Sequence, residues 1–388
     1  MPDVSQIFSW LVDGAPGAPT PVHTVARMGA DLVTAGVPID RIEAFVKTLH
    51  PHIVGRSFSW FPGGAVQVRE NSYAFLHSPE FLGSPVAAVF RSGQPVRRQL
   101  GEPSAQTEYA LLAELAAEGY TDYLAAPLTF MSGQFHAITF ATKTAGGFVQ
   151  ADIAALLDLM RPLSRVAEIF ALTRTAANLL NTYVGHDAGE RILQGRIQRG
   201  DTDSLRAVLW FSDLRGFTAM SARMEPRAII RVLNDLFDCQ VPAIERRGGQ
   251  VLKFIGDGLL AIFPLDNDRP PGPSCDAALD AAAEAQATLQ VLNAGRVAND
   301  LEPIRFGLAL HVGEVAYGNI GGSGRLDFTC IGPAVNLAAR LESLTSQLGK
   351  QMVVSAEFAA LTSRPSAQVG SFALKGVPGE VAVFEPAA

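Results

Sequence analysis

The chain has 388 residues, which is more than one hydrophobic core usually supports, so two domains joined by a connector are expected. Its 48% hydrophobic and 18% charged residues exclude a wholly disordered or collagen-like chain. The net charge of -7 argues against nucleic-acid binding, because dedicated nucleic-acid binders carry a basic surplus.

The cysteines and the apolar runs indicate the compartment. Cys239, Cys275 and Cys330 occur without CxxC spacing, so we expect neither a disulfide framework nor a thiolate zinc site. The sequence has no basic, apolar leader and no apolar run long enough to span a bilayer. These features predict a cytoplasmic protein that makes no membrane contact.

The first part of the chain predicts a mixed α/β domain over residues 21–172. Residues 1–20 are rich in Pro, Gly and Ala and are predicted to form a flexible tail. Helical patterns follow over 22–36 and 38–50. Strand-like or extended stretches come next, over 57–60, 65–69 and 94–97. A helix over 108–118 precedes two β-patterned runs, 123–130 and 135–142, so we expect helices flanking an antiparallel sheet.

A helical linker is predicted over residues 173–200. From Gln150 onward, apolar side chains such as Leu156, Leu163 and Phe170 recur at intervals of three or four. This spacing fits a coiled-coil seam and an amphipathic helix packed on its own sheet equally well. Glycines within 183–200 then indicate a connector, which places the domain boundary near residue 200.

The second domain, 201–388, predicts an α+β fold. Residues 207–212 form a buried strand pattern, and 226–247 a long helix that begins at a proline. Gly256-Asp257-Gly258 separates two strand patterns, which is typical of a hairpin. The remaining strands and helices are expected over 250–255, 259–263, 275–293, 306–312, 315–319, 334–345, 351–355 and 381–384. The order βαββαβ is that of a ferredoxin-like sheet with helices on one face.

Two aspartates lie where neighbouring strands of this sheet would end. Asp213 follows the first strand and Asp257 lies at the hairpin tip, so both carboxylates would meet at one edge. Close carboxylates repel unless a cation separates them, and the pair therefore predicts a two-metal phosphoryl-transfer site. Either residue alone would more often be a turn residue or a helix cap. Backbone N–H groups that would cradle phosphates belong to Leu214, Arg215, Gly216, Phe217 and Thr218.

Three motifs resemble, in order and spacing, the signatures of class III nucleotidyl cyclases. They are 211–218 (FSDLRGFT), 253–259 (KFIGDGL) and 332–340 (GPAVNLAAR), and the resemblance covers about 203–386. It implies cyclisation of ATP to 3′,5′-cyclic AMP and pyrophosphate by a homodimer with shared active sites. Two rival readings remain open: a guanylate cyclase, and a catalytically silent nucleotide-binding regulator.

The resemblance also implies residue roles. Asp213 and Asp257 match the ligands of two Mg²⁺ or Mn²⁺ ions per site, which would support in-line attack of the ribose 3′-hydroxyl on the α-phosphate. Lys253 matches the residue that recognises adenine, and a lysine within an apolar strand does need an acceptor unless it reaches solvent. Asn336 and Arg340 match the pair that orients ribose and stabilises the transition state. Their i, i+4 spacing puts them on one helix face, where an ordinary surface Arg–Glu pair is the alternative.

Two further positions follow from the same resemblance. Guanine-selective members carry an acid where Lys253 stands, and usually a cysteine three residues before the motif glycine, which here is Thr329. Threonine at this place resembles a bacterial subclass, some of whose members respond to bicarbonate. Lys375 is the one lysine retained from a phosphate-contacting tail, so it is a candidate triphosphate contact.

The first domain resembles a GAF domain, a small-molecule sensory module. The resemblance rests on 81–96 (FLGSPVAAVFRSGQPV), 126–128 (APL) and 146–152 (GGFVQAD), and implies regulation by an unknown small-molecule effector. The region contains no cysteine, which argues against a thioether-linked bilin. Its histidines are haem-ligand candidates, although each is more often a surface or core residue: His23, His50, His52, His77 and His136.

Overall fold

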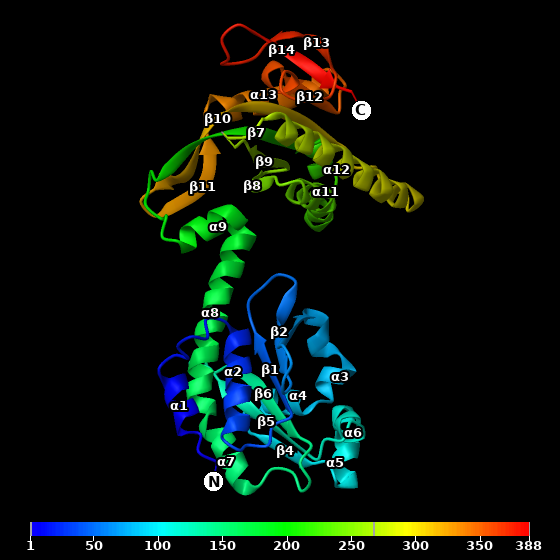
Figure 1. The fold of residues 1–388 in the computed structure, drawn as a ribbon. Coiled ribbons are helices and arrows are strands. Elements are labelled where there is room, and N and C mark those ends of the chain that lie inside the picture. Colours follow the sequence, from blue (N-terminus) through cyan, green and yellow to red (C-terminus); the bar gives the residue numbers. More distant parts are fainter. Residues whose placement is uncertain (1, 267, 388) are drawn as a thin grey trace. The chain divides into compact units, whose positions relative to one another are not determined.

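The computed structural model describes residues 2–266 and 268–387, which fold into two compact units, Met1–Leu179 and Leu180–Ala388 (Figure 1). The units divide after Leu179, whereas the glycines of 183–200 predicted a boundary near residue 200. The reason is helix α9 (His186–Leu193), which is part of the second unit rather than a connector. Its Ala188 is buried in a core cluster with Leu252 and Val315.

The first unit is built on a six-stranded antiparallel sheet with the order β3-β2-β1-β6-β5-β4. Its strands are β1 (Arg41–Lys47), β2 (Ile53–Trp60), β3 (Gln67–Ser72), β4 (Val96–Gln99), β5 (Asp122–Thr129) and β6 (Phe135–Thr142). Its helices are α1 (Ser5–Val12), α2 (Pro21–Thr34), the 3₁₀ turn Tyr73–His77, α3 (Pro79–Leu82), α4 (Pro85–Ser92), α5 (Pro103–Glu108), α6 (Ala110–Ala117), α7 (Gln150–Asp158) and α8 (Met160–Val184). Helices α2 and α8 cover one face of the sheet, and α4 and α6 cover the other (Figure 1).

Two predictions for this unit are wrong. Residues 38–50 were expected to form a helix, but they contain β1, which pairs with β2 on one side and β6 on the other. Ile42 and Phe45 of β1 are buried in different core clusters, so pairing and two-sided burial override the helical spacing of the sequence. Residues 1–20 were expected to be a flexible tail, but they contain α1.

Helix α1 is attached to the first unit through Trp10. The Trp10 side chain is 7% exposed, and its indole Nε1 donates a hydrogen bond to the Pro16 carbonyl at 3.0 Å. The guanidinium carbon of Arg27 lies 4.5 Å from the ring centroid, within the range of a cation–π contact. Ile7 and Leu11 are buried in the same core. The apolar side chains of α1 therefore outweigh the loop-like composition of the segment.

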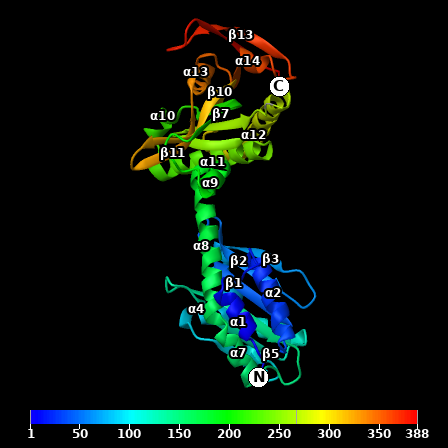
Figure 2. The same ribbon diagram turned by 60° about the vertical axis from the view of Figure 1, so that its left-hand side comes forward.

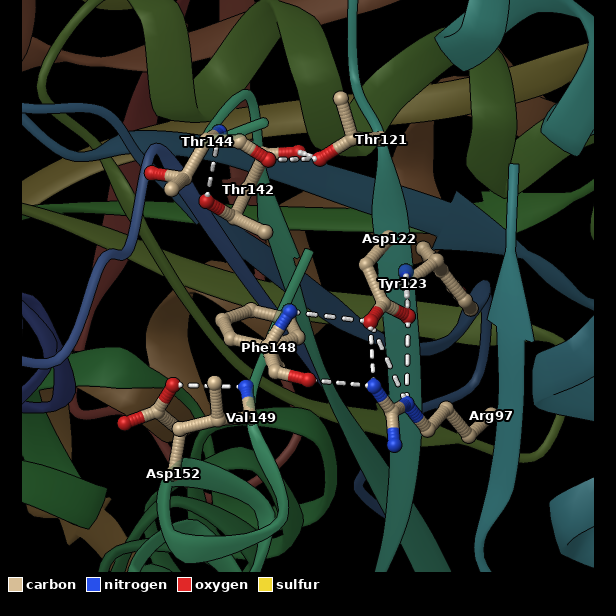
Figure 3. Close-up of polar contacts among 9 residues, drawn as sticks. All are labelled: Arg97, Thr121, Asp122, Tyr123, Thr142, Thr144, Phe148, Val149 and Asp152. Carbon is tan, nitrogen blue, oxygen red and sulfur yellow. Dashed lines mark hydrogen bonds and ion pairs between the residues drawn. The ribbon is translucent and has the colours of Figure 1, made fainter. Parts of the chain in front are cut away.

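A buried aspartate fixes the start of α7 (Figure 3). Asp122 is fully buried, and its carboxylate accepts hydrogen bonds from the Arg97 guanidinium at 2.7 Å and from the backbone N–H of Phe148 at 3.0 Å. Gly147 next to it has a φ of +73°, and a Cβ there would lie 2.6 Å from the Asp122 carboxylate. Only glycine fits this close approach, so the loop enters α7 in one geometry.

The apolar stripe that begins in α7 packs inside the first unit. Leu156, Met160, Leu163 and Val166 are all buried in a cluster with the sheet, as the amphipathic-helix alternative predicted. Further along α8 the apolar side chains are exposed, and Leu172 is 63% exposed. None of the helices in residues 2–266 and 268–387 has the length and apolar character needed to cross a bilayer.

The second unit contains an eight-stranded sheet whose centre is ferredoxin-like. Its strands are β7 (Thr202–Leu214), β8 (Gln250–Ile255), β9 (Gly258–Pro264), β10 (Phe306–Gly322), β11 (Arg325–Ile331), β12 (Met352–Ser355), β13 (Ser366–Ala373) and β14 (Glu380–Pro386). Apart from α9, its helices are α10 (Phe217–Ser221), α11 (Pro226–Arg246), α12 (Gly272–Ala298), α13 (Pro333–Gln347) and α14 (Ala356–Ala359). The order β10-β7-β9-β8, antiparallel throughout, with α11 and α12 as connections, confirms the predicted βαββαβ topology and the α+β class.

The two connecting helices, α11 and α12, lie on one face of this sheet as predicted, and the additional helices α13 and α9 cover the other face (Figures 1 and 2). Helices α11 and α12 share a core with Val208 and Trp210 of β7, while α13 and α9 share a core with the intervening residues Ala207 and Leu209. The alternation of β7 explains this, because successive side chains point to opposite faces. The two strands predicted over 306–312 and 315–319 are one continuous strand, β10.

All three cysteines lie in the second unit. Cys239, Cys275 and Cys330 are buried and free, so no disulfide forms among them. Burial raises the pKa of the Cys275 thiol to about 12 and that of Cys330 to about 11. These thiols behave as apolar core side chains.

Docking of α1 is testable by substitution. We expect Trp10→Ala to lower the free energy of unfolding by about 3–5 kcal/mol, the usual loss for a buried tryptophan. The matched control is Val12→Ala on the same helix, where the side chain is 60% exposed and little change is expected. Differential scanning calorimetry of the full chain measures both variants, and equal effects of the two substitutions would refute a docked α1.

Candidate active site

The pairing of β7 with β9 brings two carboxylates together. Asp213, near the end of β7, is the register partner of Gly258, which follows Asp257 in the turn between β8 and β9. A Cβ at position 258 would lie 2.9 Å from the Ser212 carbonyl oxygen and 3.1 Å from Asp213 Oδ1. Glycine therefore allows the hairpin tip to close against β7 and places Asp257 beside Asp213.

The electrostatics of this acid pair, Asp213 and Asp257, are unfavourable without a counterion. Burial, followed by the negative charge of Asp257, raises the pKa of Asp213 to about 7. Glu342 of α13 also contributes to this shift, and it is itself 6% exposed, with a pKa raised by burial. Glu342 was not predicted from the sequence. The signal was available, because an acid on the buried stripe of a helix needs a partner.

The donor set fits a divalent cation. Within the described residues no group of three or more His, Cys, Asp or Glu side chains is arranged to hold a metal ion. Magnesium, however, typically takes one or two carboxylates and completes its shell with water and substrate phosphates. Burial and the neighbouring carboxylates raise the pKa of Asp213, and a cation bound between the two carboxylates would offset their repulsion. Asp213 and Asp257 together therefore suit Mg²⁺ or Mn²⁺.

The loop after Asp213 turns sharply into α10. Leu214 is buried, Gly216 has a φ of +76° and Thr218 is exposed in the first turn of α10. Phe217 is partly buried and packs against the core that contains α11 and α12. No side chain caps the start of α10, so backbone N–H groups of the loop are left for other acceptors.

Arg215 uses its side chain within the unit. Its guanidinium donates hydrogen bonds to Thr345 Oγ1 and to the Lys350 carbonyl, the latter at 3.0 Å. Its backbone N–H donates to the Arg305 carbonyl at 2.8 Å. These contacts connect the loop to the C-terminal end of α13, so the Arg215 side chain supports the loop rather than extending from it.

Lys253 has an acceptor that the sequence analysis did not identify. Its Nζ lies 2.9 Å from Oδ2 of Asp327 on β11, and the lysine side chain is 34% exposed. Strand β11 was not predicted, which is why Asp327 was missed. Thr329, two residues along the same strand, lies on the same face as Asp327. Its hydroxyl oxygen is buried and has no hydrogen-bond partner in the described residues.

Asn336 and Arg340 lie together on the exposed side of α13. Both residues are exposed, while Ala334, Ala338 and Leu341 form the buried side of the helix. In residues 2–266 and 268–387 neither side chain makes an ion pair or a hydrogen bond, so the alternative of a surface Arg–Glu pair is not what the structure contains. An unpaired guanidinium beside an amide is free to bind an anion.

Lys375 lies in the loop between β13 and β14 and is exposed. Its neighbours Leu374 and Val377 belong to a core cluster that includes Leu337 and Leu341 of α13. The loop is thus anchored to the helix that carries Asn336 and Arg340. The structure gives Lys375 no further contact within the described residues.

Residues 202–384, which make up most of the second unit, match the family model of the adenylate and guanylate cyclase catalytic domain. The second unit is therefore similar to a catalytic domain of that family, in agreement with its ferredoxin-like sheet.

Comparison with known proteins supports the cyclase assignment. The chain is 34% identical over 260 residues to an adenylate cyclase of Anabaena cylindrica, which covers 62% of this chain and 49% of that protein. It is 25% identical over 282 residues to adenylate cyclase 1 of Rhizobium meliloti, covering 69% of this chain and 41% of the relative. The chain therefore spans about half, or less, of the length of these relatives. A bacterial light-regulated adenylyl cyclase has the same fold, with a TM-score of 0.50, 20% identity, and coverage of 68% of this chain and 84% of that chain.

The acid pair predicts a pH-dependent stability. The pKa of Asp213 is 3.8 when unperturbed and about 7 in the folded chain, so the folded state binds more protons between these values and stability falls as pH rises through this window. In metal-free buffer at pH 8, Asp213→Asn should raise the free energy of unfolding by roughly 1–2 kcal/mol, after allowance for solvent screening. The gain should vanish near pH 4.

Chemical denaturation with a chelator present, at pH 4, 6 and 8, measures this effect. The matched control is Asp268→Asn at an exposed loop position, which should leave the pH profile unchanged. A destabilised Asp213→Asn variant at pH 8, or a gain that does not depend on pH, would contradict the proposed repulsion.

Proposed function

We propose that the protein is an adenylate cyclase that converts ATP to 3′,5′-cyclic AMP and pyrophosphate. The observation that carries the proposal is the presence, in one domain, of the acid pair and of Lys253, whose partner Asp327 lies two residues from Thr329 on β11. The Thr329 hydroxyl has no hydrogen-bond partner within the described residues. Lysine is a donor only, which suits a ring nitrogen of adenine, and a threonine hydroxyl can accept from the adenine amino group. The adenylate cyclases among the relatives support the same substrate.

Metal ions and backbone N–H groups would act on the ribose hydroxyl and the phosphates of the nucleotide. Asp213 and Asp257 would hold two Mg²⁺ or Mn²⁺ ions, which when bound lower the pKa of the ribose 3′-hydroxyl and neutralise phosphate charge. The backbone N–H groups of Gly216, Phe217 and Thr218 would hold phosphate oxygens in the geometry needed for in-line displacement, whereas that of Arg215 is already bonded to the Arg305 carbonyl. No side chain of this site is assigned as a dedicated general base.

Asn336 and Arg340 would act at the reacting centre. The Arg340 guanidinium has no partner in the described chain, and it would neutralise the charge that develops on the α-phosphate. The Asn336 amide would orient the ribose through hydrogen bonds. Lys375, which is exposed near α13, would contact the triphosphate. An intact set of this kind argues against a catalytically silent regulator.

We also propose that two chains share each active site. The sequence favoured this because Lys253 and Asp257 would lie about 13 Å apart on one extended strand. In the structure β8 ends at Ile255 and Asp257 lies in the turn that follows, so that distance does not apply and the support for a shared site comes from the exposed edge of β8. Two antiparallel copies would bring the acid pair of one chain opposite Lys253 and Arg340 of the other, giving two symmetric sites.

The outer edge of the sheet supports a dimer. Strand β8 is the last strand of its sheet, and its residues Phe254 and Ile255 are 53% and 43% exposed. The Phe254 ring packs at a tilt against Phe237 of α11 with ring centroids 4.3 Å apart, and Ile230 of the same helix is 56% exposed. A contiguous exposed apolar patch of this kind marks an interaction surface. Burial against a second copy would cover it.

The first unit is proposed to be a GAF-like sensory domain that regulates the cyclase in response to a small molecule. Its antiparallel sheet with helices on both faces supports this assignment. Helix α8 begins within its core and continues to Val184, past the division at Leu179. A change in the packing of α8 would therefore be transmitted along one continuous helix.

Base selectivity is tested with purified protein, Mn²⁺, and ATP or GTP, with mass spectrometry of the product. We expect cyclic AMP from the natural chain. Lys253→Glu combined with Thr329→Cys should reduce ATP turnover about tenfold or more, because the loss of a hydrogen bond to a buried group costs roughly 1–3 kcal/mol. The control is Arg269→Glu, a charge reversal at a side chain that is 82% exposed. Wild-type ATP turnover in the double variant would mean that these residues do not recognise adenine.

Site sharing is tested by complementation. Homodimers of Asp213→Ala and of Arg340→Ala should each be nearly inactive, because each lacks one half of both sites. Heterodimers isolated through two different affinity tags should contain one intact site and one doubly damaged site, so their activity should approach half that of the wild type. If such heterodimers are as inactive as either parent, each site belongs to a single chain.

A further inference from the structure

The first unit contains a cavity between its sheet and helices α2 and α8. The cavity has a volume of about 480 Å³, which is within the range of roughly 300–1,000 Å³ typical of small-molecule sites. Its walls come from α2, β1, β2, β3, β5, β6 and α8. Most of the wall is apolar and includes Val25, Ala44, Phe58, Ile138, Leu163 and Val166. An interior of this kind favours an apolar ligand body over a nucleotide or a sugar.

Two arginines contribute the charge of the cavity lining. Arg56 of β2 forms an ion pair with Glu70, with Nε 3.0 Å from Oε1. Arg174 of α8 is solvent-exposed where it borders the cavity, and it has no ion pair in residues 2–266 and 268–387. Burial lowers the pKa of Arg174, the positive charge of Arg56 lowers it further, and Glu70 opposes both effects. Two guanidinium groups thus face one carboxylate, which leaves one positive charge unbalanced.

The other titratable group near these arginines adds no negative charge. The pKa of His50 is lowered by burial first, then by His52, while Arg174 and Arg56 lower it further and Glu70 raises it. His50 is therefore neutral at physiological pH and does not balance Arg174. A planar guanidinium without a partner is suited to bidentate binding of a carboxylate.

We propose that this cavity binds an aliphatic monocarboxylate of medium chain length. The carboxylate would pair with Arg174, with Arg56 nearby, and the alkyl chain would extend between the sheet and α8. One unbalanced positive charge matches one negative charge on the ligand, and the apolar walls match an unbranched chain. The site is separate from the cyclase residues, which all lie after Leu179.

Ligand binding in this cavity would change the packing of helix α8. Leu163, Val166, Phe170 and Arg174 line it at intervals of three or four residues, so the ligand would contact one stripe along α8. Filling the cavity would hold this stripe against the sheet. Regulation of the cyclase by this route rests on the proposed function, whereas binding of the carboxylate does not.

The binding test uses the full chain, without nucleotide, and isothermal titration with dodecanoate below its micellar concentration. We expect saturable binding at one site per chain and binding at least tenfold weaker for dodecyltrimethylammonium, which carries the opposite charge. Arg174→Gln should weaken dodecanoate binding at least tenfold, because hydrogen bonds to charged groups are the strong ones. Arg161→Gln is the matched control on the same helix, because Arg161 lies outside the cavity lining and its loss should change nothing.

A second variant tests the cavity itself. Ala167→Phe should fill the space beside α8 and abolish binding, and circular dichroism checks that the variant folds. No saturable binding, equal binding of the cationic amphiphile, or equal affinity in Arg174→Gln and Arg161→Gln would overturn the proposal. Tenfold tighter binding of dodecyl phosphate would also overturn it, since the head group would then not be a carboxylate. A failure of cyclase activity in any assay would leave these binding results unaffected.

Discussion

The register between β7 and β9 is the constraint on which the candidate active site depends. It places Asp213 opposite Gly258, and so sets Asp257 beside Asp213 at the cost of electrostatic repulsion. A buried network next to this pair ties β7 to α11 and opposes a shift of the strand. Trp210 Nε1 donates to Ser212 Oγ at 3.2 Å, and Ser212 Oγ donates to Gln240 Oε1 of α11 at 2.6 Å. A one-residue shift would break this network and turn the apolar side chains of β7 to the wrong faces.

Helix α13 contributes both to the surroundings of the acid pair and to the proposed binding of ribose and phosphate. Its buried side brings Glu342 toward the acid pair, and its exposed side carries Asn336 and Arg340. The loop after β7 is tied to the end of this helix through Arg215, so the acid pair and the helix are parts of one rigid arrangement. Gly307 lies where the groups meet, and a Cβ there would approach Glu342 Oε1 to 2.4 Å. The buried side chains of α13 also pack into two core clusters.

The parts of the fold that the sequence predicted are those in which local signals agree with the tertiary contacts. The β8–β9 hairpin has its glycine turn, and β5 and β6 have continuous β-patterned sequence, so their positions are close to those expected. Strand β11 has no such signal, because its side chains do not alternate: residues 325–327 are exposed and residues 328–330 are buried. Asp327 was missed together with this strand. Residues 38–50 carry helical spacing but contain β1, which pairs with β2 on one side and with β6 on the other. Pairings between residues far apart in the chain decide such segments, and composition does not encode them.

The placement of the cysteines makes thiol labelling a measure of local unfolding in the second unit. All three thiols are buried in Leu180–Ala388, with pKa values raised by burial for Cys275 and Cys330. Only a thiolate reacts rapidly with alkylating reagents, so the folded domain would resist labelling at neutral pH. Modification would then require transient opening of the cyclase domain. Because residues 1–179 contain no cysteine, the rate of thiol labelling would report the opening of the second unit alone.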